Sequence, residues 1–113
     1  ILHHTEGTTE ISDYQYSSSN CIDCYGQLTI PDSVIKIGKY AFANNADLEG
    51  DLEIPESVKL IDDFAFYGCS GFESILFNEG LETIGNCAFF GCSEMYCELT
   101  IPSTVKSIGS SAF

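Results

Sequence analysis

One motif recurs four times along this 113-residue chain, at intervals of 24, 23 and 24 residues. Each copy opens on two apolar residues separated by one position and ends on an Ala-Phe pair. The copies begin at Leu28, Leu52, Ile75 and Leu99. A unit of this length cannot bury its own apolar side chains, whereas stacked units bury them against one another. The repetition therefore predicts a β-rich solenoid, a right-handed superhelix of 23–24-residue repeats with little helix.

The first residues of each copy have the pattern of a short β-strand. In Leu-x-Ile the apolar residues alternate with period two, so both side chains point to the same side of the strand. The Val-x-x-Ile segment that follows returns a second apolar pair to the interior, and the Phe of the Ala-Phe pair fills the layer. The expected core of the stacked repeats consists of Ile30, Ile54, Phe77, Ile101, Phe42, Phe66, Phe89 and Phe113.

Proline and glycine mark where each repeat turns. Proline follows the strand directly at positions 31, 55 and 102, where it ends the strand. Glycine at positions 38, 85 and 109 is expected to permit a tight bend. Asp62 replaces this glycine in one copy.

The repeat boundaries divide the chain into two parts. The four expected repeats are residues 28–51, 52–74, 75–98 and the partial repeat 99–113. Residues 1–27 are expected to form an N-terminal arm and a degenerate half-repeat. Ile11 to Tyr16 matches the register of Ile37 to Phe42, whereas Ile1 to Thr9 is expected to be a flexible arm or the remnant of a cap.

The charge of the chain excludes some partners. There are 17 acidic residues against four lysines and no arginine, which gives a net charge of −13. Such a charge repels phosphate backbones and anionic membrane surfaces, so nucleic acid is not an expected partner. No run approaches 18 consecutive apolar residues, so membrane insertion is not expected either. The charge either keeps an exposed β-rich surface soluble or selects a basic partner. The content of six cysteines favours an extracellular or cell-surface setting.

The repeated residues resemble a known family. Leu-Thr-Ile-Pro-Asp-Ser-Val, then Ile-Gly-Lys-Tyr-Ala-Phe up to Phe42, and Ala-Phe-Tyr-Gly-Cys-Ser at 65–70 are similar to the BspA-type leucine-rich repeat. The resemblance covers roughly residues 10–113, with departures at Asn78, where Pro is usual, and at Asp62, where Gly is usual. It implies a surface or secreted protein, of the kind that adheres to host proteins or aggregates cells. It implies no catalytic residue.

The motif Cys21-x-x-Cys24 invites a metal or redox interpretation. Zinc binding needs a second ligand pair, and only His3 and His4, on the expected arm, are candidates. The repeat register accounts for both cysteines without a metal, because Cys24 falls on a core position and Cys21 on a loop position. No metal and no cofactor are therefore expected.

Cys69 and Cys92 occupy equivalent positions of neighbouring repeats. Stacking would bring their Cα atoms to roughly 5 Å, which allows a disulfide. The alternative is a ladder of buried reduced thiols. Cys87 and Cys97 break the repeat pattern, and a local crosslink is one explanation for them.

The outward positions of the strands are the expected ligand face. The middle residue of each Leu-x-Ile strand faces solvent, and across the repeats these residues are Thr29, Glu53, Leu76 and Thr100. No convergent acid–base group and no Gly-x-Ser-x-Gly motif is present, so no catalytic residue and no enzyme is expected.

Two functions of different class follow from the sequence. The first is a non-enzymatic module of an adhesin-like protein that binds a host or neighbouring-cell surface protein through the repeat face. The second is a structural subunit that stacks end to end into an extracellular filament, because neither end of the chain shows a polar cap. The same observation also fits a segment whose ends are covered by further repeats.

Overall fold

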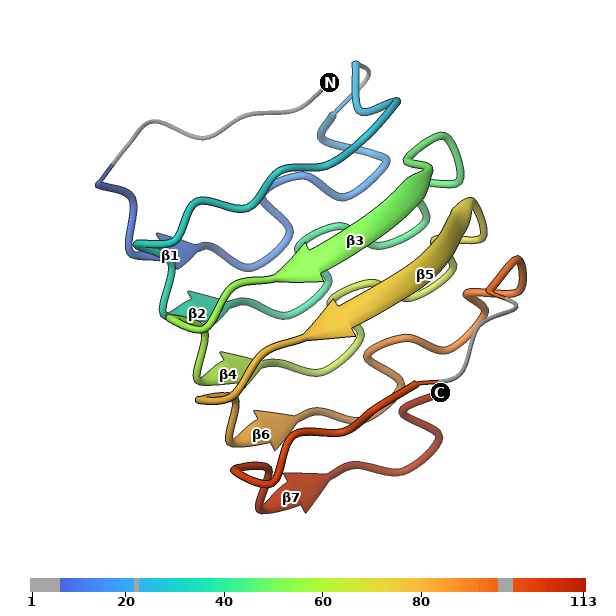
Figure 1. The fold of residues 1–113 in the computed structure, drawn as a ribbon. Coiled ribbons are helices and arrows are strands. Elements are labelled where there is room, and N and C mark those ends of the chain that lie inside the picture. Colours follow the sequence, from blue (N-terminus) through green and yellow to red (C-terminus); the bar gives the residue numbers. More distant parts are fainter. Residues whose placement is uncertain (1–6, 22, 96–98) are drawn as a thin grey trace.

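The computed structural model describes residues 7–21, 23–95 and 99–113. Within these residues the chain forms a β-solenoid without helix, in which successive coils lie one below another (Figure 1). Two parallel sheets run along the stack. No helix of the described residues is long and apolar enough to cross a membrane.

The five-stranded sheet takes one short strand from each coil, in the order β1-β2-β4-β6-β7. Its strands are β1 (Glu10–Ile11), β2 (Lys36–Ile37), β4 (Leu60–Ile61), β6 (Thr83–Ile84) and β7 (Ser107–Ile108). The second residue of each strand pairs with the second residue of the next, so the isoleucines form a column. The first four isoleucines are fully buried, whereas Ile108 is 48% exposed.

The two-stranded sheet consists of β3 (Gly50–Ile54) and β5 (Phe72–Phe77), which pair in parallel. Leu52 pairs with Ile75 and Ile54 with Phe77, and all four side chains are buried. The predicted Leu-x-Ile strand therefore occurs in the second and third repeats. Residues 28–31 and 99–102 carry the same motif outside any extended strand.

Stacked aromatic rings fill the interior. Phe66 stacks on Phe42 and on Phe89, each with ring centroids 5.1 Å apart. Tyr16 extends this column at one end and Phe113 at the other, both at 5.5 Å. Each inner ring of the column therefore buries both faces against the rings of the adjacent coils, and each end ring buries one face.

Six of the eight expected core residues are buried, and two are not. Ile30, Ile54, Phe77, Phe42, Phe66 and Phe89 have at most 7% of their surface exposed. Ile101 is 37% and Phe113 is 44% exposed, so the prediction of a buried position is wrong for these two. Both belong to the last described coil, and no other described coil covers their outer side.

The N-terminal residues begin the stack earlier than the sequence predicts. The carbonyl of Thr9 accepts a hydrogen bond from the Ile35 backbone, and the carbonyl of Thr8 accepts one from the Ser33 hydroxyl. Thr8 and Thr9 are therefore docked against the next coil, which fits the remnant of a cap and not a flexible arm. Ile1 to Glu6 lie outside the described residues.

Gly38 and Gly85 open the expected tight bend, since their carbonyls accept hydrogen bonds from the Ala41 and Ala88 backbones. Glycine is needed there for close contact between coils and not for a special backbone conformation. None of Gly38, Gly85 and Gly109 has a positive φ. A Cβ added at Gly85 would lie 2.5 Å from the backbone nitrogen of Asp63, and one at Gly109 would lie 2.4 Å from Asn86 Oδ1. Asn86 Oδ1 accepts a hydrogen bond from the Ser110 backbone, so the absent side chain makes room for a bond between coils.

A left-handed backbone conformation recurs at one equivalent non-glycine position of each coil. These five positions are Tyr14, Tyr40, Phe64, Cys87 and Ser111, with φ between 53° and 61°; Asn44, with φ 63°, adopts it in addition. For bulky residues this conformation is uncommon and costs on the order of 1 kcal/mol. The rings of Tyr14, Tyr40 and Phe64 stack at 4.9 and 4.8 Å, which offsets part of that cost.

Candidate functional site

The outer face of the β3–β5 sheet carries the residues expected to bind a ligand. Glu53 of β3 pairs with Leu76 of β5, and both side chains point away from the core. Thr29 and Thr100, from the coils on either side, are also exposed. Leu76 is 55% exposed, which places an apolar side chain on a polar face. Single exposed leucines are common, so this observation gains weight only from its surroundings.

Hydrogen bonds between the strands orient the acidic side chains of this face. Ser74 Oγ donates to Asp51 Oδ1 at 2.6 Å, and Asn78 Nδ2 donates to Glu53 Oε2 at 3.2 Å. Asn78 Nδ2 also donates to the carbonyl of Ile54 at 2.9 Å. Asn78 stands where the other repeats have proline, and these two bonds give a physical reason for the replacement. The second oxygen of each carboxylate remains available to a ligand.

A hollow of about 420 Å³ lies between β3 and the preceding segment. Its lining consists of Gln27, Leu28, Thr29, Ile30, Pro31, Asp32, Asp51, Glu53 and Pro55. The volume is within the range that accommodates small ligands or a few side chains. Apolar groups and three carboxylates line the same hollow, so a cationic side chain with an aliphatic stem would fit its chemistry.

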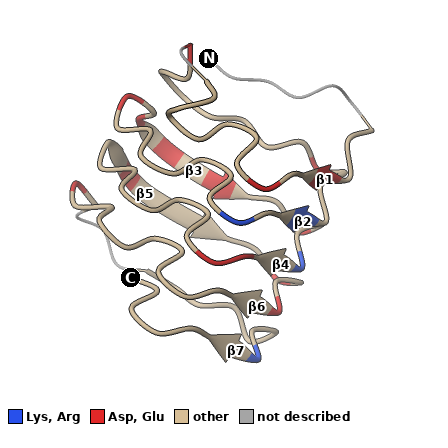
Figure 2. Ribbon diagram, turned by 180° about the vertical axis from the view of Figure 1, so that it is seen from behind, with Lys and Arg blue, Asp and Glu red and all other residues tan. Residues whose placement is uncertain are grey.

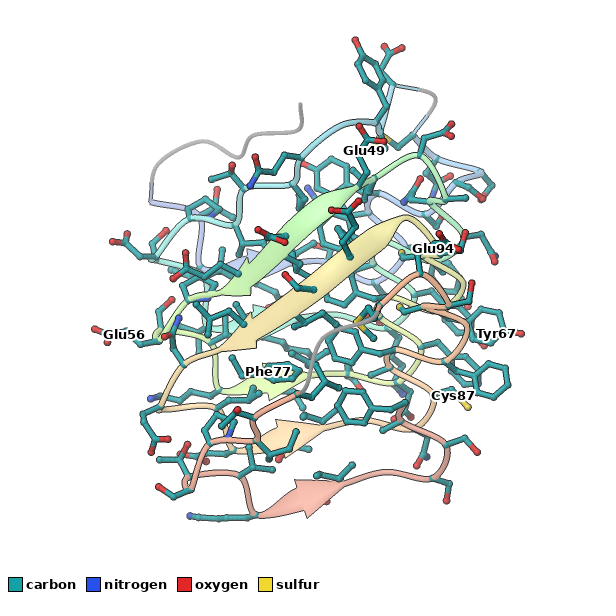
Figure 3. The ribbon with its side chains drawn as sticks, turned by 45° about the vertical axis from the view of Figure 1, so that its right-hand side comes forward. Glu49, Glu56, Tyr67, Phe77, Cys87 and Glu94 are labelled. Atoms are coloured by element: carbon teal, nitrogen blue, oxygen red, sulfur yellow. A yellow bond between two sulfur atoms is a disulfide. The ribbon has the colours of Figure 1, made fainter. Side chains whose placement is uncertain are left out.

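A second hollow, of about 430 Å³, lies at the other end of the two strands. Glu49, Glu73 and Glu94 contribute its carboxylates, and Gly50 and Gly71 form the remainder of its lining. Figure 3 shows Glu49 and Glu94 projecting outward from this end, whereas Phe77 points into the interior. Both hollows beside the β3–β5 sheet are therefore acidic.

The positive charges lie elsewhere on the molecule. Lys36 is in β2, Lys39 follows it, and Lys59 and Lys106 directly precede β4 and β7. Figure 2 shows the lysines along the five-stranded sheet and acidic residues on β3. Across the described residues, one ion pair occurs, between Lys36 Nζ and Asp62 Oδ2 at 4.0 Å. No lysine therefore neutralises the carboxylates of the β3–β5 face.

Cys69 and Cys92 form a ladder of buried thiols and not a disulfide. The Cys69 thiol donates to the carbonyl of Phe42 at 3.0 Å, and the Cys92 thiol donates to that of Phe66 at 3.4 Å. Burial raises the pKa of Cys92 to about 12, and burial together with the neighbouring Cys92 raises the pKa of Cys69 further. Both thiols therefore stay protonated and unreactive at neutral pH.

Among the described residues, a disulfide joins Cys21 and Cys24. The repeat register gave this pair no covalent role, although it did place Cys24 in the core, where it is 5% exposed. Cys87 is a free thiol and partly exposed, so among described residues it has no crosslink. Cys97, for which a local crosslink was one explanation, lies outside the described residues. No group of three or more His, Cys, Asp or Glu side chains among those described is placed to hold a metal ion.

Comparison with known families agrees with the coil geometry. The family model of the BspA type leucine rich repeat region matches residues 5–113, in six copies. The chain belongs to this family. As a BspA-type chain it is a repeat protein, of a kind that is often surface-associated, generally not enzymatic and generally engaged in protein–protein interaction. Neither a curated protein nor a solved structure matches it.

The sequence analysis missed the acidic residues beside the expected BspA-type ligand row. Asp32 and Asp51 line the first hollow, but they lie outside the middle position of the Leu-x-Ile strand. One signal was present: Asp51 and Glu53 alternate with Leu52 and Ile54, which places both acids on the outer side of one strand. The hollow itself has no signal in the sequence.

Proposed function

We propose that this chain is a non-enzymatic protein-binding module of a cell-surface or secreted protein, and that it binds through the outer face of β3 and β5. The observation that carries the proposal is the exposed Leu76 on a sheet face whose acidic side chains are oriented by Ser74 and Asn78. An apolar centre with a polar rim is the usual composition of an interaction surface. Thr29 and Thr100 extend this face to the adjacent coils.

The family supports the same function and location. Members of BspA-type repeat families are typically surface or secreted proteins, and their repeats generally contact other proteins. The partner class is therefore a host or neighbouring-cell surface protein. No nucleic acid is proposed, because the chain has a net charge of −13.

A solid-phase assay with immobilised matrix and cell-surface proteins tests the proposal. We expect saturable binding, weakened about tenfold by Leu76→Ser, because the exposed leucine would become buried at the interface. Ile35→Ser is the matched control: Ile35 is 51% exposed, close to the 55% of Leu76, but precedes β2 on the other sheet. Absence of saturable binding, or equal loss with both variants, would refute the proposal.

End-to-end stacking is the second candidate. Ile101, Ile108 and Phe113 of the last coil are each more than one-third exposed, and a further coil would bury them. A second copy of the chain that supplies this coil would make a heterologous contact, which propagates as a filament. Light scattering and negative-stain electron microscopy test this candidate. Filaments that Ile108→Asp disperses would support it, and a monodisperse monomer at high concentration would refute it.

A further inference from the structure

The outer face of β3 combines regular spacing with unbalanced charge. Asp51 and Glu53 are two residues apart on the same strand, so their Cα atoms are spaced by about 6.6 Å. Glu49 lies just before the strand, and the backbone between it and Asp51 is not extended, because Gly50 has a φ of 79°. Asp51 and Glu53 are both exposed and form a line of negative charge with the period of an extended chain.

Nothing within the described residues balances this line. The acidic side chains accept hydrogen bonds only from the neutral groups of Ser74 and Asn78. The one ion pair of the described residues, Lys36 with Asp62, lies on the other sheet. Because the bonds to Ser74 and Asn78 fix one oxygen of each carboxylate, the other oxygen is preoriented for a cationic group.

The two hollows give such cationic groups a place to lie. The first hollow is beside Asp51 and Glu53, and the second is beside Glu49. Pro31 and Pro55, which are partly exposed, supply apolar surface in the first hollow, which suits the aliphatic stem of a lysine or arginine. Leu76 of β5 pairs with Glu53 of β3, so it offers an apolar contact beside that carboxylate.

We infer that the β3 face binds an extended basic segment of the partner protein, with lysine or arginine at every second position. In an extended segment, alternate side chains point to the same side with the same spacing as Asp51 and Glu53. Each basic side chain then meets one carboxylate, and the intervening side chains point to solvent. This inference rests on the proposed protein-binding function and specifies the partner's chemistry.

The test measures fluorescence anisotropy of labelled peptides mixed with the whole chain. One probe is the alternating hexapeptide Lys-Thr-Lys-Thr-Lys-Thr, and the other is its isomer Lys-Lys-Thr-Thr-Lys-Thr, which has the same charge but no two lysines two positions apart. We expect the alternating peptide to bind at least fivefold more tightly at low salt, and both peptides to bind more weakly as salt rises. Equal affinities of the two peptides would overturn the inference.

Paired variants locate the site. Asp51→Asn with Glu53→Gln removes two charges while keeping acceptors for Ser74 and Asn78, and should weaken the alternating peptide about tenfold. Glu10→Gln with Glu82→Gln removes two exposed charges beside the five-stranded sheet, and should change its affinity less than twofold. Equal weakening by both pairs would show attraction to net charge alone and would overturn the inference.

Competition separates this inference from the proposed function. Excess alternating peptide should displace the chain from its immobilised protein partner. If Leu76→Ser weakens binding to that partner but the peptide does not compete, the protein-binding function stands and the basic-segment inference is wrong. If no partner is bound and the peptide still shows its spacing preference, the inference stands and the wider function fails.

Discussion

Asp62 Oδ1 accepts a hydrogen bond from the backbone N–H of Asp63 at 2.8 Å, in the one repeat where Asp replaces Gly. In the neighbouring coils the equivalent N–H groups bond to the coil above: Lys39 to Asp13 and Asn86 to Asp63. Asp63 cannot do so, because the residue above it is Lys39, whose side chain has no acceptor. Asp62 therefore supplies locally the acceptor that Lys39 lacks.

Restoring the repeat pattern at only one of these two positions should destabilise the fold. Asp62→Gly leaves the Asp63 N–H without its acceptor and should lower the free energy of unfolding by about 1 kcal/mol. Lys39→Asn alone should also lower the stability. The new Asn side chain would lie above position 62, and glycine is needed at position 62 to make room for it, as Gly85 and Gly109 do in their coils. The double variant should recover stability close to that of the parent.

Chemical denaturation of the four proteins forms a double-mutant cycle that checks this relationship. The expected coupling is favourable and at least as large as the loss caused by Asp62→Gly. Additive losses would mean that Lys39 and Asp62 are independent.

The buried thiols predict a loss of stability at high pH. Because the folded pKa of Cys92 is about 12, above the ordinary value of 9.0, folding favours the protonated thiol. The stabilisation that comes from this shift is fully present below pH 9 and is lost as the pH rises toward 12. Over this range the unfolding free energy falls by up to about 1.4 kcal/mol per pH unit for each thiol. Unfolding free energies measured from pH 8 to 11 should fall accordingly.

Cys92→Ser supplies the comparison, since a serine hydroxyl donates to the Phe66 carbonyl but does not titrate in this range. This variant should show a shallower slope than the parent. In the folded protein a thiol reagent should modify the partly exposed Cys87 before Cys69 and Cys92. Fast modification of all three would contradict the buried ladder.

The disulfide between Cys21 and Cys24 should contribute modestly to stability. It closes a short loop, with a sequence separation of 3, so the entropy that it removes from the unfolded chain corresponds to about 2 kcal/mol. Cys21→Ser with Cys24→Ser should lower the unfolding free energy by about that amount. Parent protein measured with a reductant should match the double variant, and no change in either case would argue against the bond.

Asn45 should tolerate cysteine better than alanine. It is 4% exposed, and its Nδ2 donates to the carbonyls of Tyr16 and Phe42. At the equivalent positions of the next two coils, the thiols of Cys69 and Cys92 each donate one hydrogen bond to a backbone carbonyl. Asn45→Ala removes both of these hydrogen bonds and should cost about 1–3 kcal/mol. Asn45→Cys should cost less than half as much in thermal or chemical denaturation; a larger loss than for alanine would exclude an equivalent role.

The sequence by itself determined the repeat and the direction of most side chains. The spacing of Leu-x-Ile and Ala-Phe predicted which residues face inward, because alternation along a strand is a local property of the backbone. It also matched Ile11 with Ile37 and Tyr16 with Phe42, which the structure pairs and stacks. The family followed from the same residues.

Only the tertiary structure decided how groups from different coils meet. Whether Cys69 and Cys92 form a bond, why glycine is needed at position 85, and whether Thr8 is docked all depend on contacts between residues about 23 positions or more apart. The hollow beside Asp51 likewise depends on where residues 27–32 run relative to β3. A periodic pattern specifies the interior of each coil, whereas the distance between side chains of adjacent coils is set by how the coils pack.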